Sequence, residues 1–583
     1  MLYPQTNAFR SQILLNGLWN FEIDPENQGE AQGIPDTPNL GRTIAVPGSW
    51  NEQFSDLHNY LQTAWYHRSI FVPSLDESKR AFLRIGAACN HCRAWVNGVL
   101  VGEYRLGYLP ACFDVTEALQ VGENQLVIKV DSILTDKTLP TAAFDQGHWA
   151  GFEMAADYFP YCGIHRDVNL LFVPKDGLEN VKAETRLDET TADLQVQVWL
   201  HGRVTGVRAT LCDGTDEIAG GSVVVDVQGN ASQASMQLAV KNPNLWSPES
   251  PHLYELRVEC LDASGEVCDC YVQSVGLRTI EVGSKGLLLN GQPFMIRGFS
   301  RHEDFPIIGR GHCDAVMVRD FELMKWIGAN AFRTSHYPYD ERQYQMADRL
   351  GVLVIDEAPV VSLFFPKNGQ TPESMISPEQ RALHRQAIRD MMQRDWNHPS
   401  VIAWSVANEC NGSTEKTSLY FKEMVELAKR LDSTRAVVHT NCGGMPDPSH
   451  QWCDLTCVNY YDFPHNKPGR DVESVRDSLS ANLDKIHKQF GKPVLLSEFG
   501  MCGIPGRHSL SPLYFTEEGM VDHVMRYLDV AAEKDYLCGV LIWLLQDFKA
   551  QEGPGRPTEN FKGMFDRLRQ PKLIAHLLKR RWE

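Results

Sequence analysis

The alternation of apolar segments in the last part of the chain constrains its fold most strongly. From about residue 276, short apolar runs alternate with amphipathic helical patterns, and eight of the runs have the length of buried strands. Eight such strand–helix units in about 300 residues predict a (β/α)8 barrel. The predicted strands are Phe294–Gly298, Ala329–Thr334, Val352–Asp356, Val401–Ala407, Ala436–Thr440, Leu455–Asn459, Val494–Glu498 and Gly539–Trp543.

Two of the intervening segments have clear helix signals. Ser377 is a predicted N-cap, with Pro378 at the first helical position and Gln380 at the capping-box position. A later segment has an apolar face formed by Phe421, Met424, Ala428 and Leu431.

The first 275 or so residues have a strand pattern instead. Short alternating runs such as Gly17–Ile23 lie between turn signals, and Asn97-Gly98 predicts a tight hairpin. We therefore expect a jelly-roll-like β-sandwich at residues 1–177 and an immunoglobulin-like β-sandwich at 178–275, followed by the barrel at 276–583.

Composition excludes some classes of partner. The net charge of −18 and the pI near 5.5 argue against binding to nucleic acid or to an anionic membrane surface. No apolar run has the length of a membrane span, and the N-terminus has no signal-peptide pattern, so we expect a cytoplasmic protein. The fifteen cysteines show no disulfide framework and are expected to be reduced.

The ends of the predicted barrel strands carry the candidate chemistry, because the active site of such a barrel lies there. Glu409 follows strand four and Glu498 ends strand seven, and these two strands face one another across the mouth. Two carboxyl groups across a sugar site can act as acid and nucleophile. The alternative for a single strand-end glutamate is a buried ion pair, and other carboxylates at this rim are expected to pair with Arg301 or Arg333.

No competing chemistry is visible in the sequence. It has no glycine-rich phosphate loop, no serine nucleophile elbow and no HExxH motif. The pair Cys89 and Cys92 lacks a second pair of metal ligands, and the cluster His302–Asp304 is more typical of strand-end hydrogen bonding than of a metal site. We expect neither a metal nor a cofactor.

Several motifs resemble those of the family 2 glycoside hydrolases. Ile402–Glu409 resembles the W-S-x-x-N-E signature of that family, and Val494–Gly500 resembles its nucleophile strand. Five further matches extend the resemblance over nearly the whole chain: Leu15–Trp19, Val46–Ser49, Tyr161–Arg166, Phe299–Asp304 and Phe332–Pro338. The resemblance implies a retaining glycosidase built from two sandwiches and a barrel.

The resemblance also assigns roles to individual residues. Glu409 matches the general acid/base, Glu498 the nucleophile, and Asn408 the residue that hydrogen-bonds the 2-hydroxyl of the sugar. Four more residues match the lining of the sugar pocket, the last of them from a sandwich loop that reaches the barrel mouth: His336, Tyr461, Trp543 and Asp157.

A short motif near the C-terminus indicates the class of sugar. Asn560-Phe-Lys562 resembles the N-x-K element with which β-glucuronidases of this family hold the sugar carboxylate, and Arg556 stands at a matching upstream position. An ammonium and an amide donor suit a carboxylate in a partly dry pocket. The resemblance implies a β-D-glucuronide substrate, whereas the alternative is that Lys562 is a solvated loop lysine.

Two departures from the family pattern leave alternatives open. Asn459-Tyr-Tyr461 is followed by Asp-Phe-Pro-His465, without the second tyrosine expected there, so a β-galacturonidase or a dual enzyme is an alternative. The segment from Pro359 to Ser377 is short, so we expect no long lid. A family 2 enzyme for a neutral sugar and a non-catalytic carbohydrate-binding protein are further alternatives, and homo-oligomers (dimers or tetramers) are expected from the family.

Overall fold

The apolar runs of the C-terminal half form a closed barrel of eight parallel strands, which confirms the predicted fold class. The computed structural model describes residues 2–143, 153–154, 157–188, 190–224, 231–284, 286–366, 369–443, 447–462, 473–552 and 556–583. The barrel strands are β26 (Ile296–Ser300), β27 (Ala331–Arg333), β28 (Leu353–Glu357), β29 (Val401–Asn408), β30 (Ala436–Cys442), β31 (Thr456–Asn459), β32 (Val494–Glu498) and β33 (Leu537–Trp543).

The predicted start of the first barrel strand was wrong because of a hairpin, whereas the starts of β27 and β33 differ from the prediction by two residues within the same strands. Phe294 does not begin the first barrel strand but ends β25 (Gln292–Phe294), which pairs with β24 (Gly286–Leu289) in a hairpin. Asn290 and Gly291 at the hairpin turn both have positive φ, as a tight two-residue turn requires. The chain therefore reverses before the barrel begins at Ile296.

Helices surround the barrel in the predicted alternation. They are α2 (Asp314–Ile327), α3 (Glu341–Leu350), α4 (Pro378–Asp395), α5 (Glu415–Leu431), α6 (Glu473–Phe490), α7 (Glu517–Ala532) and α8 (Leu573–Trp582), with short 3-10 turns η2 (Pro372–Met375) and η3 (Pro448–Trp452). Ser377 caps α4 by accepting a hydrogen bond from the Gln380 N–H, as predicted. The other half of the capping box is absent, because the Gln380 amide donates to the Asp136 carbonyl in the first sandwich.

Apolar side chains close the N-terminal end of the barrel. A small sheet of β23 (Ile280–Gly283), β24 and β25 contributes Leu287 and Leu289 to one buried cluster with Leu353, Ile402 and Leu495 from the barrel strands. Polar side chains are thereby left to the C-terminal end, where the predicted site lies.

The first sandwich has one sheet in the order β1-β15-β6-β10 and another in the order β3-β2-β5-β11-β8-β9. Their strands are β1 (Ser11–Leu14), β2 (Gly17–Ile23), β3 (Arg42–Val46), β5 (Thr63–Val72), β6 (Lys79–Ile85), β8 (His91–Val96), β9 (Val99–Tyr104), β10 (Ala111–Asp114), β11 (Gly122–Asp131) and β15 (Val168–Pro174). Asn97 and Gly98 form the predicted hairpin turn between β8 and β9, both with positive φ.

The first sandwich also contains several short strands and helical turns. They are β4 (Gly48–Ser49), α1 (Trp50–Gln53), η1 (Ser55–Leu57), β7 (Ala88–Cys89), β12 (Ala142–Ala143), β13 (Glu153–Met154) and β14 (Gly163–Ile164). Beyond the barrel strands, β34 (Phe548–Lys549) pairs with β35 (Glu559–Asn560). No helix in the described part of the chain is both long and apolar enough to cross a membrane.

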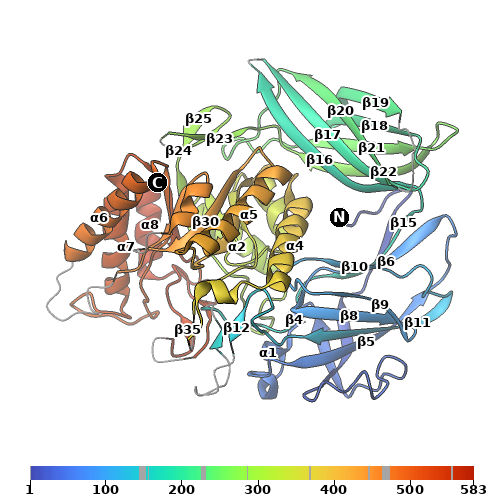
Figure 1. Cartoon of the computed structure of the whole chain (residues 1–583), viewed down its shortest axis with the longest axis horizontal. Helices are drawn as coiled ribbons and strands as arrows, with labels where there is room; N and C mark the ends of the chain where they lie inside the picture. The colour runs from blue at the N-terminus through green and yellow to red at the C-terminus, as the bar shows by residue number, and fades with distance from the viewer. Residues whose placement is uncertain are drawn as a thin grey trace.

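The described residues of the second sandwich form seven strands in sheets of three and four, an immunoglobulin-like arrangement. They are β16 (Gly177–Asp188), β17 (Thr191–His201), β18 (Gly206–Asp213), β19 (Asp216–Val224), β20 (Ala231–Lys241), β21 (Tyr254–Leu261) and β22 (Val267–Val275). Figure 1 shows both sandwiches on one side of the barrel, the second above the first.

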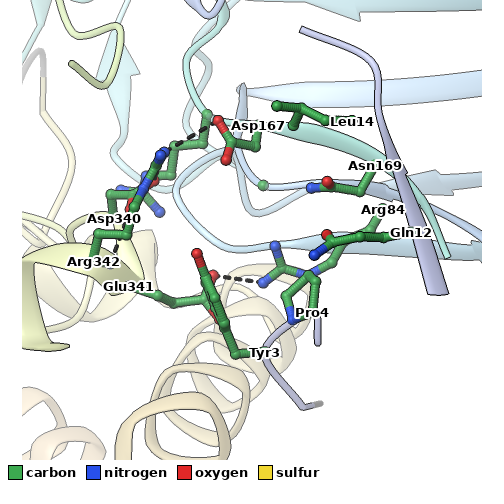
Figure 2. Close-up of a pocket in the computed structure, with 12 residues that line it drawn as sticks. Tyr3, Pro4, Gln12, Leu14, Arg84, Asp167, Asn169, Asp340, Glu341 and Arg342 are labelled. Atoms are coloured by element: carbon green, nitrogen blue, oxygen red, sulfur yellow. Dashed lines mark hydrogen bonds and ion pairs between the residues drawn. The ribbon is translucent and has the colours of Figure 1, made fainter. Parts of the chain in front are cut away.

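Buried ion pairs fix the first sandwich against the barrel. Figure 2 shows Arg84 of β6 reaching Glu341 of α3, with Asn169 of β15 nearby. These residues line a cavity of about 260 Å³. An Arg84 guanidinium nitrogen lies 2.6 Å from the Glu341 carboxylate, and an Arg342 nitrogen lies 3.1 Å from that of Asp167. Because Arg84 and Glu341 are nearly fully buried, each is the other's main electrostatic compensation.

Replacement of Arg84 therefore tests how firmly this interface is held. In Arg84→Met the Glu341 carboxylate is left buried and uncompensated, which is expected to cost about 3–5 kcal/mol of stability. The matched control is Arg42→Met, which removes an arginine from an exposed pair with Asp56 and is expected to cost about 0–1 kcal/mol. Urea unfolding midpoints of both variants measure the difference, and equal shifts would contradict a buried, compensating pair.

Candidate active site

Glu498 lies at the C-terminal end of β32 and is nearly fully buried. One of its carboxylate oxygens accepts a hydrogen bond from Arg333 at 2.6 Å, and the other accepts one from the Tyr461 hydroxyl at 2.9 Å. Burial raises the pKa of Glu498, while the nearby Arg333 and His336 act in the opposite direction. The carboxylate is thus held in a fixed orientation by two donors from neighbouring strand ends.

Glu409 follows β29 directly and is more exposed than Glu498. Its backbone lies in the left-handed region with φ of 48°, an uncommon conformation for a residue with a side chain. The Asn459 amide donates to its carboxylate at 3.0 Å, and no arginine or lysine contact of this carboxylate is among the described interactions. The charge of Glu409 is one of the influences that raise the pKa of Glu498, so the two carboxyl groups face the same space.

Arg333, at the end of β27, connects the carboxylates of the barrel mouth. Besides Glu498, it contacts Glu357 at 3.1 Å and donates to the Asn408 amide oxygen at 3.0 Å. Burial alone would raise the pKa of Glu357, but Arg333 and a hydrogen bond from His336 hold it below its ordinary value. The prediction that Arg333 supports carboxylates at the rim is consistent with these contacts.

Arg301 was predicted to do the same, and the structure places it elsewhere. It pairs with Asp320 of α2 at 2.8 Å, not with a strand-end carboxylate. The neighbouring acids Glu303 and Asp304 pair with Arg166 and Arg567, whose positions far away in the sequence gave no signal of this contact.

His336 and Trp543 form one wall of the site. Their rings stack with centroids 5.2 Å apart and an interplanar angle of 10°. One ring nitrogen of His336 lies 2.7 Å from Glu357, and the other lies 3.7 Å from Glu498 and 3.5 Å from the Asn408 amide nitrogen. The Asn408 amide oxygen already accepts from Arg333 and Asn459, so its NH2 group is the part oriented to donate to a ligand.

A second group of predicted residues lies beside this wall. The Asp157 carboxylate accepts hydrogen bonds from the Arg556 side chain, at 3.0 and 3.1 Å from its Nε, and from the Asn560 amide at 2.9 Å. Asp157 therefore connects the first sandwich to the segment that carries Lys562. The pairing of Asp157 with Arg556 could not be predicted, because the resemblance assigns each of them to the sugar and not to the other.

Lys562 is buried, and its ammonium group lies 4.6 Å from the centre of the Tyr461 ring. Within the described residues no carboxylate or hydrogen-bond acceptor contacts that ammonium. Burial lowers the pKa of Lys562, and the charge of Arg556 lowers it further. A buried cation without an ion pair in direct contact is costly, so the site is suited to receive an anionic group from outside.

All ten residues predicted for the site thus lie around one barrel mouth, in two groups joined by Tyr461, which contacts both Glu498 and Lys562. The roles of Glu357 and Asn459 in holding His336 and Glu409 were missed, although both are strand-end residues. Phe463, Pro464 and His465, on which the choice of C4 epimer depends, lie outside the described residues, as do 367–368 of the short Pro359–Ser377 segment.

The described residues contain no arrangement typical of a metal site. No group of three or more His, Cys, Asp or Glu side chains gathers there in a way that could hold a metal ion. All fifteen cysteines are free thiols, including Cys89 and Cys92.

Comparison with known families agrees with this arrangement. The family model "Glycosyl hydrolases family 2, TIM barrel domain" matches residues 280–583, and the models for the sugar-binding domain and for the remaining domain of the same family match residues 13–174 and 177–278. The chain belongs to glycosyl hydrolase family 2. As a member of that family it is a glycoside hydrolase.

Relatives within family 2 match the chain over its full length. A beta-glucuronidase of Paenibacillus borealis is 36% identical, covering 100% of this chain and 98% of that protein. The solved structure of a beta-glucuronidase from an uncultured Clostridium sp. has a TM-score of 0.92 at 33% identity, covering 100% and 99% of the two chains. A Bifidobacterium dentium beta-glucuronidase, solved with coumarin-3-O-glucuronide, has a TM-score of 0.93 at 32% identity, covering 100% and 98%.

The lowered pKa of Lys562 gives a testable pH dependence. Above its folded-state pKa the lysine loses the charge that attracts a carboxylate, and that pKa lies below the ordinary 10.5. The inhibition constant of D-glucuronate is therefore expected to rise with pH before pH 10.5 is reached. In Lys562→Met the inhibition constant should be larger than in the unmodified enzyme and independent of pH over this window. An equally steep rise with pH in that variant would contradict the assignment.

Proposed function

We propose that this chain hydrolyses β-D-glucuronides with retained configuration, releasing glucuronate from an aglycone or another sugar. The observation that carries the proposal is the buried ammonium of Lys562, which lies beside Tyr461 and has no carboxylate or hydrogen-bond acceptor in contact among the described residues. The Tyr461 hydroxyl in turn donates to Glu498. A sugar whose anomeric carbon faces Glu498 can place an equatorial carboxylate at Lys562, where a charge-assisted hydrogen bond forms.

The contacts of the two glutamates support a division of roles. Glu498 attacks the anomeric carbon and forms a glycosyl-enzyme, while Glu409 donates a proton to the leaving oxygen. Glu409, now a carboxylate, takes a proton from water while the water oxygen attacks the anomeric carbon and the bond to Glu498 breaks. The sugar leaves with its configuration retained, Glu498 returns as a carboxylate and Glu409 is protonated again. Arg333 and Tyr461 orient the nucleophile, and the Asn408 amide donates to the 2-hydroxyl, a contact that strengthens as positive charge develops on the sugar.

The relatives favour this substrate over the alternatives. Those compared above are all named beta-glucuronidases, and one was solved with a glucuronide bound. A neutral sugar would leave the buried Lys562 ammonium without an acceptor in contact among the residues that the structure describes. A purely binding protein would not require both Glu409 and Glu498 in fixed orientations. A galacturonide differs only at C4, so it is the control substrate that tests the finer choice.

Other expectations stay predictions. We propose domain limits at residues 1–177, 178–275 and 276–583, which follow the change from sandwich strands to barrel strands. The cytoplasmic location and the homo-oligomeric state, dimer or tetramer, are likewise predictions that cell fractionation and light scattering can test.

Substitution of Lys562 tests the proposed substrate class. In Lys562→Met the ratio of kcat/KM for nitrophenyl β-glucuronide to that for nitrophenyl β-glucoside is expected to fall about 10- to 100-fold, because a charge-assisted hydrogen bond is worth about 1.5–3 kcal/mol. Galacturonide and galactoside should be assayed beside them.

The matched control is Lys534→Met. Lys534 pairs with Asp484 just before β33, at the end of the barrel opposite the site, so its loss should leave the ratio unchanged. A proportional fall for both substrates in Lys562→Met would mean that this lysine only supports its loop, and the proposed substrate class would then be wrong.

A further inference from the structure

A buried ion pair brackets the segment that carries Lys562. The Lys572 ammonium lies 2.7 Å from the Asp547 carboxylate. The same Asp547 oxygen accepts a hydrogen bond from the Gly563 N–H at 2.8 Å, and Lys572 donates to the Phe561 carbonyl at 3.0 Å. The pair therefore binds the backbone on both sides of Lys562, one partner to each neighbour.

The pair is itself firmly placed. The Asp547 and Lys572 side chains are 0% and 1% exposed, and they come from separate elements, the segment after β33 and the residue that precedes α8. The Asp547 N–H donates to the Phe565 carbonyl at 2.9 Å, and the Lys572 N–H donates to the Met564 carbonyl at 3.0 Å. Both partners thus hold the segment through backbone and side-chain bonds.

Both backbone polar groups of Lys562 are hydrogen-bonded. Its N–H donates to the Asn560 side chain at 3.2 Å, and its carbonyl accepts from the Leu544 N–H at 3.2 Å. A Cβ at Gly563 would lie 2.1 Å from the Asp547 nitrogen, so only glycine allows this close approach. With both neighbours fixed, the direction in which the Lys562 side chain leaves the backbone is determined.

We propose that Asp547 and Lys572 are positioning residues that aim the Lys562 ammonium at the carboxylate of the substrate. This inference rests on the proposed uronide function and deepens it. Neither residue contacts Glu409 or Glu498 in any described interaction, so their effect is on recognition of the carboxylate and not on bond cleavage.

The charges of the pair favour this role over a purely stabilising one. Two ions removed from water lose hydration that their attraction only partly restores, so apolar side chains of similar volume would stabilise the same place as well or better. What apolar side chains cannot supply is a donor for the Phe561 carbonyl and an acceptor for the Gly563 N–H. A ligand-binding group held within a fraction of an ångström needs such supporting bonds.

The test compares Lys572→Met with Lys562→Met, alone and combined. Lys572→Met is expected to lower the ratio of kcat/KM for nitrophenyl β-glucuronide to that for nitrophenyl β-glucoside about tenfold, mostly through a higher KM for the glucuronide. In Lys562→Met/Lys572→Met the ratio should equal that of Lys562→Met, because Lys572 acts through Lys562. Asp547→Asn, which keeps an acceptor oxygen, should lower the ratio less than Lys572→Met.

Two outcomes would overturn the inference. In the first, Lys572→Met lowers kcat/KM for the glucuronide and for the glucoside in proportion. In the second, its effect on the ratio adds fully to that of Lys562→Met. If Lys572→Met does not fold, Asp547→Leu/Lys572→Met is expected to fold, because it removes both charges and so leaves no unpaired ion buried, which is the larger cost. The same fall in ratio is expected there, and an unchanged ratio would contradict the inference.

Failure of the underlying function is distinguishable in the same experiment. If Lys562→Met alone leaves the ratio unchanged, or the unmodified enzyme does not prefer the glucuronide, the proposed substrate class is wrong. If Lys562→Met lowers the ratio while Lys572→Met does not, the substrate class stands and only the positioning role fails.

Discussion

The site depends on the guanidinium of Arg333 at the end of β27. A barrel mouth that directs several strand ends toward one axis also brings their carboxylates together, and like charges in a dry space repel. Arg333 is almost fully buried and contacts Glu357, Glu498 and the Asn408 amide oxygen at 2.6–3.1 Å. Its planar fork suits this task, because several acceptors can be bound in fixed directions by one charge.

A chain of contacts then leads from the nucleophile to the group proposed to recognise the substrate. Glu498 accepts from Tyr461, whose ring lies under the Lys562 ammonium. Glu498 can thus hold the reacting carbon of a sugar ring while Lys562 holds the C6 carboxylate of the same ring. Binding energy gained at the carboxylate then serves to place the anomeric carbon against Glu498, which is how remote contacts promote a reaction.

Much of this could be predicted from local sequence patterns. The eight barrel strands follow from the alternation of apolar runs with helical patterns, and the strand-end location of a barrel active site indicates Glu409 and Glu498 without any motif. The start of the first strand was missed because the Asn290-Gly291 turn places Phe294 in a hairpin.

Pairings between distant residues could not be predicted in this way. Gln380 has the sequence position of a capping-box partner, yet it reaches Asp136 in another domain. Arg301 pairs with Asp320 of a helix, and Asp547 pairs with Lys572 beyond the last barrel strand. Such contacts are determined by three-dimensional packing and produce no repeating pattern in the sequence.

The covalent role of Glu498 is the central claim, and trapping the glycosyl-enzyme tests it most directly. A 2-deoxy-2-fluoro β-glucuronide with a good leaving group should react with the enzyme, and the resulting glycosyl-enzyme should persist. Fluorine at C2 destabilises the oxocarbenium-like transition state of both steps, while the good leaving group keeps the first step fast. Mass spectrometry of the digested protein is expected to find one fluoroglucuronyl group on the peptide that contains Glu498. A label on Glu409, or turnover of the substrate without any covalent adduct, would contradict the account.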